Sequence, residues 1–102
     1  MPARARDYLL GWNPWGKSLV VGYGPGNARH PHHWASVIGA GLPIGAVVGG
    51  PAEKAQIVEQ GFTASGALNT ADAAYVDVKA NYVTSEPALD YTVNSILLLA
   101  SL

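Results

Sequence analysis

Residues 11–51 limit the possible folds of this chain more than any other feature, because they are dense in glycine and proline. Both residue types interrupt regular backbone hydrogen bonding, and only residues 18–24 and 45–50 resemble strands. Each of these two segments is too short to build the core of a sheet. All three tryptophans lie in the same region. We therefore predict a long, aromatic-rich loop, which in a compact domain is usually functional.

Two short helices are predicted on either side of this loop region. Residues 3–10 are typical of the last turns of a helix, and Gly11 stands where a C-terminal stop is common. A second helix is expected at about residues 52–60, ended by Gly61. The polar residues 63–70 that follow are expected to form an excursion on the surface.

The segment 86–102 predicts the longest helix of the chain. Pro87 suits its first helical position, which makes Glu86 the N-cap or its neighbour. Apolar residues recur at helical spacing on one face that we expect to be buried, namely Leu89, Val93, Ile96, Leu97 and Ala100. Tyr91 and Leu98 lie outside that face. The helix is therefore apolar on most sides, and such a helix is usually buried among other helices.

The predicted helices are too few to enclose the last one and also to cover the loop region. The physical interpretation is a piece of a larger, mainly α protein, whose remaining helices would cover these faces. The length agrees, because 102 residues form at most one small domain.

The composition excludes several classes of function. Charged residues make up 13% of the chain, against a usual share of about 25%, so much of the surface is expected to be covered. A formal net charge of -1 favours neither a nucleic acid nor an anionic membrane surface as partner. The longest apolar run, residues 96–100, is far short of the ~20 residues of a membrane span. Without cysteine, disulfides and thiolate zinc sites are excluded.

Three histidines, His30, His32 and His33, stand within four positions around Pro31 and directly before Trp34. A shared metal site is disfavoured, because Pro31 excludes a helix that would aim the rings and no cysteine or nearby carboxylate completes the shell. Two interpretations remain open. Either the histidines are incidental residues of a loop, or they contact a carbohydrate, since imidazole nitrogens bond hydroxyls and tryptophan rings stack on sugars.

Three acidic residues, Glu86, Asp77 and Asp90, are candidates for catalysis. Glu86 either stabilises a helix N-terminus, by roughly 0.3–1 kcal/mol, or is a carboxylic acid able to protonate a leaving oxygen. For Asp90 the interpretation as a solvated or capping carboxylate is stronger. Trp12 and Trp15 flank a turn, and each is either a core residue or a platform for a sugar.

Four motifs in order resemble the C-terminal part of glycoside hydrolase family 9 cellulases: "DYLLGWNPWGKSLVVGYG", "RHPHHWAS", "GAVVGGP" and "YVDVKANYVTSEPALDY". The match runs over about residues 7–102 and breaks only at the polar stretch before Ala73. The resemblance implies an (α/α)6 barrel whose cleft is built from loops at one end of the helices, and cleavage of β-1,4-glucan with inversion. Residues 1–102 would then be the C-terminal part of the catalytic domain, a partial barrel and not a complete one.

The resemblance also implies roles for single residues. Glu86 matches the general acid, His32 the histidine that binds sugar near the cleavage point, and Asp77 an aspartate with a supportive role in catalysis. We expect the substrate-binding residues to be Arg29, His32, His33, Trp34, Tyr82 and Trp15. The chain departs from the family pattern at three positions, with Trp34 in place of an arginine, Asn81 in place of an aspartate and Thr92 in place of an asparagine.

The catalytic base of this family belongs to an aspartate motif well N-terminal to these segments. No "DAGD"-like stretch occurs here, so the chain is expected to supply only the acid. The expected partners are β-1,4-glucan (cellulose) and the remainder of the catalytic domain, with no metal and no cofactor in this chain. Secretion is inferred from the family, although the sequence shows no signal peptide. The alternative is a non-catalytic carbohydrate-binding protein or an inactive remnant of the family.

Overall fold

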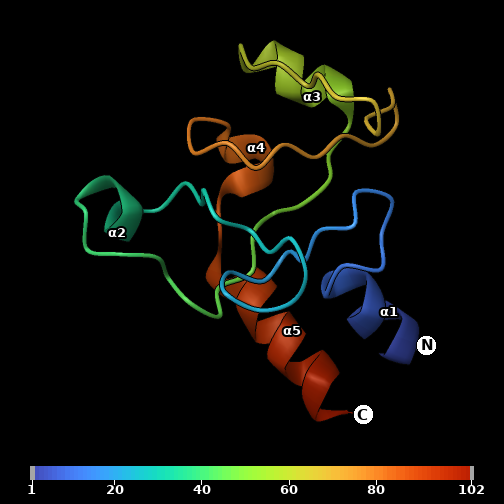
Figure 1. The fold of residues 1–102 in the computed structure, drawn as a ribbon, viewed down its shortest axis with the longest axis vertical. Coiled ribbons are helices and arrows are strands. Elements are labelled where there is room, and N and C mark those ends of the chain that lie inside the picture. The colour runs from blue at the N-terminus through green and yellow to red at the C-terminus, as the bar shows by residue number, and fades with distance from the viewer. Residues whose placement is uncertain (1, 102) are drawn as a thin grey trace.

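The regular elements of this computed structural model, which describes residues 2–101, are helices (Figure 1). The described residues form the helices α1 (Pro2–Leu9), α2 (Trp34–Val37), α3 (Lys54–Glu59), α4 (Tyr82–Ser85) and α5 (Leu89–Ala100). Extended segments in this part of the chain meet only at isolated antiparallel bridges, and no strand forms. The predicted mainly α class is therefore confirmed. None of the described helices is long and apolar enough to cross a membrane.

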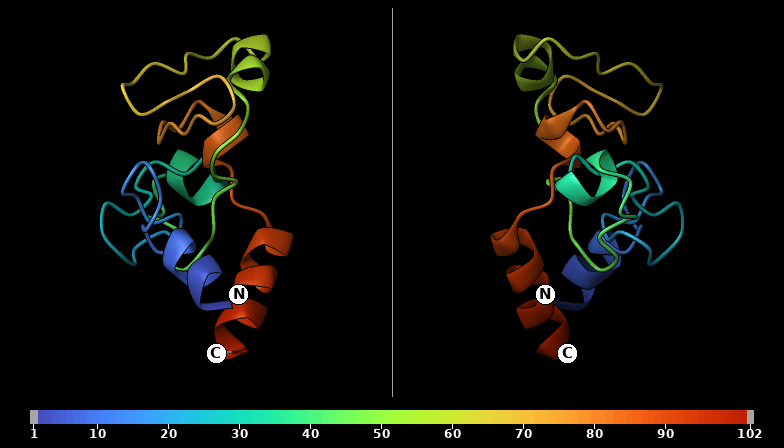
Figure 2. Two further views of the ribbon diagram at one scale, coloured as in Figure 1. Left: turned by 90° about the vertical axis from the view of Figure 1, so that its right-hand side faces the viewer. Right: turned by 90° about the vertical axis from the view of Figure 1, so that its left-hand side faces the viewer.

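The helices gather at the two ends of the molecule, with the loops between them. Helices α1 and α5 lie side by side at one end, while α3 and α4 pack at the other (Figures 1 and 2). The short helix α2 lies within a long loop at one side of the molecule (Figure 1). Residues 29–33, which carry the three histidines and are called the histidine loop below, lie between these two groups of helices (Figure 1).

The first and third helices agree with the sequence prediction. Gly11 adopts a φ of +117°, a conformation that glycine tolerates best, and so provides the predicted stop after α1. Helix α3 is shorter than residues 52–60, and the chain turns at Gly61 with a φ of +84°. Residues 63–70 are mostly exposed, as predicted, although Ala64 is buried.

The two strand-like segments of the loop region pair with each other without forming a sheet. The Val21 N–H donates to the Ala46 carbonyl at 2.9 Å, and the Val48 N–H donates to the Leu19 carbonyl at 3.1 Å. Both segments contribute to the larger apolar core, whose buried members are Leu19, Val21, Ala28, Val48 and Tyr75. The glycine-rich region is therefore held by an apolar core that it shares with Tyr75 and with Leu9 of α1, and not by a sheet.

The start of the last helix differs from the prediction. Helix α5 begins at Leu89 with Ala88 as its N-cap, and Glu86 instead caps the C-terminus of α4. The prediction that Glu86 lies at the N-terminus of the last helix is wrong. Glu86 has a φ of -79° and a ψ of 120°, the extended region that a following proline favours. Pro87 then pairs with Val48, so the chain is extended between the two helices.

The apolar face predicted on the last helix is exposed. Leu89 is 86% exposed, Ile96 60% and Leu97 63%, so the predicted burial is wrong within the described residues. The opposite side faces α1 and includes Leu98, which lines a groove of about 470 Å³ between the two helices. The exposed face agrees with the expectation that further helices are needed to cover it.

Candidate active site

One cavity of about 350 Å³ brings together four of the predicted site residues. Its lining is made by two segments far apart in the sequence, and consists of His32, His33, Trp34, Val37, Glu86 and Pro87. A backbone hydrogen bond joins the two segments, since the His32 N–H donates to the Ser85 carbonyl at 3.0 Å. The carboxyl of Glu86 is thereby placed beside the histidine loop.

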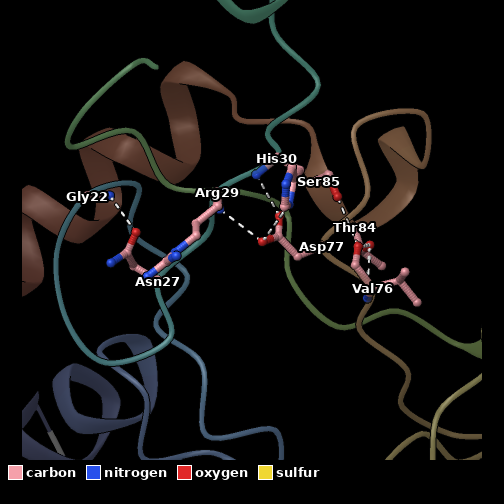
Figure 3. A network of polar contacts seen from close by, with 8 residues as sticks. All are labelled: Gly22, Asn27, Arg29, His30, Val76, Asp77, Thr84 and Ser85. Carbon is pink, nitrogen blue, oxygen red and sulfur yellow. Dashed lines mark hydrogen bonds and ion pairs between the residues drawn. The ribbon is translucent and has the colours of Figure 1, made fainter. Parts of the chain in front are cut away.

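Asp77 binds the backbone of the histidine loop and does not line this cavity. Its carboxylate accepts the backbone N–H of Arg29 and that of His30, each at 2.9 Å, and lies 3.4 Å from Nδ1 of His30 (Figure 3). The Asp77 side chain is only 11% exposed. Carboxylates that accept backbone N–H groups fix the segments they hold, so Asp77 holds the backbone at Arg29 and His30 in this structure.

Two buried hydroxyl groups connect the Asp77 segment to α4. The Thr84 hydroxyl donates to the Val76 carbonyl at 2.7 Å, and the Ser85 hydroxyl donates to the same carbonyl at 3.0 Å (Figure 3). Thr84 and Ser85 are both fully buried. The residues that precede Glu86 are therefore bound to the segment that anchors the histidine loop.

The hydrogen bond of His32 fixes which ring nitrogen carries a proton. Its Nδ1 lies 2.8 Å from the carbonyl oxygen of Lys79, and a carbonyl only accepts, so Nδ1 must be the donor. In the neutral ring Nε2 then carries a lone pair. The ring also lies against Tyr82, with centroids 5.9 Å apart. The neutral His32 ring, which lines the cavity, therefore has its acceptor at Nε2.

His33 has the opposite arrangement because it caps a helix. It is the N-cap of α2, and its Nδ1 accepts the backbone N–H of Ala35 at 3.1 Å. Nδ1 is therefore unprotonated, and the proton of the neutral ring must lie on Nε2. The two adjacent histidines thus present one acceptor and one donor.

The remaining wall of the cavity is apolar. Trp34 is the first residue of α2 and is 75% exposed, an unusual exposure for so large an apolar side chain. Val37 lies three positions later on the same helix, and Pro87 follows Glu86. A flat exposed indole beside hydrogen-bonding groups is typical of a surface that binds a sugar.

A family model for glycosyl hydrolase family 9 matches residues 2–99. The chain belongs to glycosyl hydrolase family 9. This confirms the family that the four sequence motifs predicted.

Two glucanases align along nearly the whole chain. An endoglucanase from Dictyostelium discoideum is 33% identical over 107 residues, which are 94% of this chain and 13% of that protein. A xyloglucan-specific endo-beta-1,4-glucanase, BoGH9A from Bacteroides ovatus, is 35% identical over 102 residues, or 97% of this chain and 16% of that protein. The chain thus spans less than a fifth of the length of these relatives.

A solved family 9 structure agrees with the fold. The structure of AaCel9A in complex with cellobiose-like isofagomine matches with a TM-score of 0.83 and 35% identity, over 98% of this chain and 19% of that chain. The fold is therefore a part of the family's (α/α)6 barrel and not a complete barrel, as predicted.

Three residues predicted to bind substrate lie outside the cavity. Arg29 lines a separate cavity of about 450 Å³ with Asp77. Trp15 is half-buried, and its indole N–H donates to the side chain of Asn69 at 2.6 Å. Tyr82 donates its hydroxyl to Gln60 and lines a third cavity. The structure therefore brings together four of the residues that the family 9 resemblance indicated for the site, and not these three.

Two departures from the family 9 pattern have different surroundings. Asn81 is 2% exposed, and neither polar atom of its side chain has a partner among the described residues. The Thr92 hydroxyl accepts the Val47 N–H at 3.3 Å and donates to the Ala88 carbonyl at 3.1 Å. Thr92 thus connects α5 to the loop region.

Sequence reasoning missed several contributors to the site. Val37 and Pro87 line the cavity, and the carbonyl groups of Lys79 and Ser85 hold His32. Val37 would have been found by predicting a helix after Pro31, because it lies one turn after Trp34. The carbonyl partners leave no signal in the sequence. The described residues contain no group of three or more side chains arranged to hold a metal.

Tyr75 is a titratable residue of the larger apolar core. Burial raises the pKa of its hydroxyl, and the negative charge of Asp77 raises it further. Its hydroxyl has no hydrogen-bond partner among the described residues. Tyr75 therefore stays neutral, and it lies in the core and not in the cavity beside Glu86.

Proposed function

We propose that residues 1–102 are the C-terminal part of a family 9 catalytic domain that hydrolyses β-1,4-glucosidic bonds with inversion. Glu86 is the general acid in this proposal, and His32 and His33 bind the sugar. The observation that carries the proposal is the shared cavity, which is lined by Glu86 together with His32, His33 and the exposed Trp34.

Glu86 would act by giving its proton to the glycosidic oxygen as the bond to the anomeric carbon breaks. A water molecule attacks that carbon from the opposite side and loses its proton to a base, and Glu86 is left as a carboxylate. Asp77 is unsuited to be this base, because its carboxylate already accepts hydrogen bonds from two backbone N–H groups of the histidine loop. We therefore assign the base to a part of the domain beyond residues 2–101.

The relatives support β-1,4-glucan as the class of substrate. One is named a xyloglucan-specific endo-beta-1,4-glucanase, and a solved relative was determined with a cellobiose-like isofagomine. The proton transfers above use side chains and water, so the proposal assigns no cofactor to this chain. Because the proposed substrate is a polymer such as cellulose, we propose that the protein acts outside the cell.

The test is Glu86→Gln in the complete catalytic domain. Loss of general acid catalysis should lower kcat on cello-oligosaccharides by about 10²–10⁴-fold. Aryl cellobiosides should be hydrolysed at close to the original rate, because their leaving group needs little protonation.

Glu53→Gln is the matched control, since Glu53 is exposed beside α3 and lies outside the cavity. It should leave both substrates unaffected. Equal losses on both substrates in Glu86→Gln would contradict the acid role. Unchanged turnover of both would show that another residue is the acid, and sugar binding without any turnover by the complete protein would favour the non-catalytic alternative.

A further inference from the structure

Helix α2 carries Trp34, which lines the cavity beside Glu86, and its four residues are too few to form a stable helix by themselves. Its N-terminus is capped by a neighbouring side chain, because Nδ1 of His33 accepts the Ala35 N–H. Residues 30–52 contain no lysine or arginine. Any such cation that caps the C-terminus of α2 must therefore come from a distant part of the chain.

Lys79 supplies this second cap. The carbonyls of Trp34 and Ala35 accept backbone N–H groups from the turn that follows α2, at 2.9 and 2.8 Å. The next carbonyl, that of Ser36, accepts the Lys79 ammonium at 2.8 Å. A lysine on the last carbonyls of a helix both satisfies an acceptor and opposes the partial negative charge there. The C-terminal end of α2 is thus held by a side chain that is 43 positions away in the sequence.

The main chain of the same residue holds His32. The Lys79 carbonyl accepts Nδ1–H of His32 at 2.8 Å. Lys79 therefore contacts both the histidine and the helix of Trp34, although it does not line the cavity itself. A substitution at Lys79 removes only the contact to α2, since every residue has a backbone carbonyl.

We propose that Lys79 is the positioning residue for Trp34, because its ammonium fixes α2 and so keeps the indole at the cavity beside Glu86. The inference rests on the proposed function, in which this cavity binds a glucan unit next to the acid. The carbonyl and the ammonium of Lys79 then align His32 and Trp34 for the same sugar.

The experiment measures steady-state kinetics of the complete catalytic domain on cello-oligosaccharides. Lys79→Met keeps the aliphatic part of the side chain and removes the donor, so KM should rise roughly threefold to tenfold, the effect of one hydrogen bond. The turnover number kcat should be little changed, because buried hydroxyls hold the residues directly before Glu86. Lys79→Arg keeps a cationic donor and should restore KM. Lys54→Met, at an exposed lysine of α3 outside the cavity, is the matched control and should leave both constants unchanged.

A double-mutant cycle separates positioning of Trp34 from a general effect on stability. If Lys79 acts through Trp34, Lys79→Met should raise KM in the otherwise unmodified domain and add nothing once Trp34→Ala has removed the indole. A purely structural role would instead lower the fraction of active enzyme, which reduces the apparent kcat and not KM.

The outcomes distinguish this inference from the proposed function. An unchanged KM in Lys79→Met, the same increase with and without Trp34, or no recovery in Lys79→Arg would overturn the positioning role. If Glu86→Gln lowers kcat while Lys79→Met leaves KM unchanged, the acid role stands and only this inference fails. If Glu86→Gln keeps the original turnover, the proposed function fails, and with it the premise of this inference.

Discussion

Replacing Asp77 separates a positioning role from a catalytic one. Asp77→Ala removes the acceptor of two backbone N–H groups, each 2.9 Å from the carboxylate, and leaves a cavity in place of a side chain that is 11% exposed. Hydrogen bonds to a charged group contribute about 1.5–3 kcal/mol each, and water can reach the exposed Arg29 and His30 in the variant. The free energy of unfolding should therefore fall by about 2–4 kcal/mol. Asp77→Asn keeps one acceptor oxygen and should cost about half as much.

The assay combines urea unfolding of the complete domain with kinetics on a cello-oligosaccharide and an aryl cellobioside. A displaced histidine loop should raise KM for both substrates by a similar factor, since both need His32 and His33 in place. Glu86→Gln, by contrast, should distinguish the two substrates through kcat. The positioning role of Asp77 would be refuted by unchanged stability together with a kcat loss that the aryl leaving group restores.

Two further predictions concern the core and the last helix. Tyr75→Phe should stabilise the protein by about 1 kcal/mol, because the Tyr75 hydroxyl is buried without a partner. Because the folded state raises the pKa of Tyr75, wild-type stability should decline above about pH 10, and Tyr75→Phe should decline less in urea unfolding across that range. Leu97→Glu should change the unfolding free energy of the 102-residue chain by less than about 0.5 kcal/mol, since Leu97 is 63% exposed, but should prevent soluble expression of the complete domain. Ile57→Ala, at a fully buried position, is the contrasting variant and should cost the short chain about 2–5 kcal/mol; equal losses in both would contradict an uncovered α5 face.

Local signals predicted a large part of the fold. The glycine stop at Gly11 and the turn at Gly61 bound helices close to where the sequence placed them, because positive φ is a local requirement that glycine satisfies. The exposure of residues 63–70 likewise follows from their polarity. The motif resemblance predicted the family, because four motifs in order are more specific than any one of them.

The position of Glu86 could not be predicted, because Pro87 is compatible with two conformations. Proline suits the first turn of a helix and equally suits an extended segment that imposes extension on the residue before it. The choice is decided by contacts distant in sequence, namely the bridge from Pro87 to Val48 and the hydrogen bond from the Gly49 N–H to the Glu86 carbonyl at 3.0 Å. Neither contact leaves a mark near Glu86 in the sequence.

The assembly of the site depends on backbone groups more than on the side chains that line it. His32 donates its N–H to the carbonyl of Ser85, the residue directly before Glu86, and so Glu86 and His32 are separated by one hydrogen bond and one peptide unit. On the histidine loop, the Asp77 carboxylate accepts the Arg29 N–H. On α4, the Thr84 hydroxyl donates to the carbonyl of Val76, the residue directly before Asp77. Changes at the cavity surface, such as a tryptophan where the family pattern has an arginine, can then alter what is bound without moving Glu86 relative to His32.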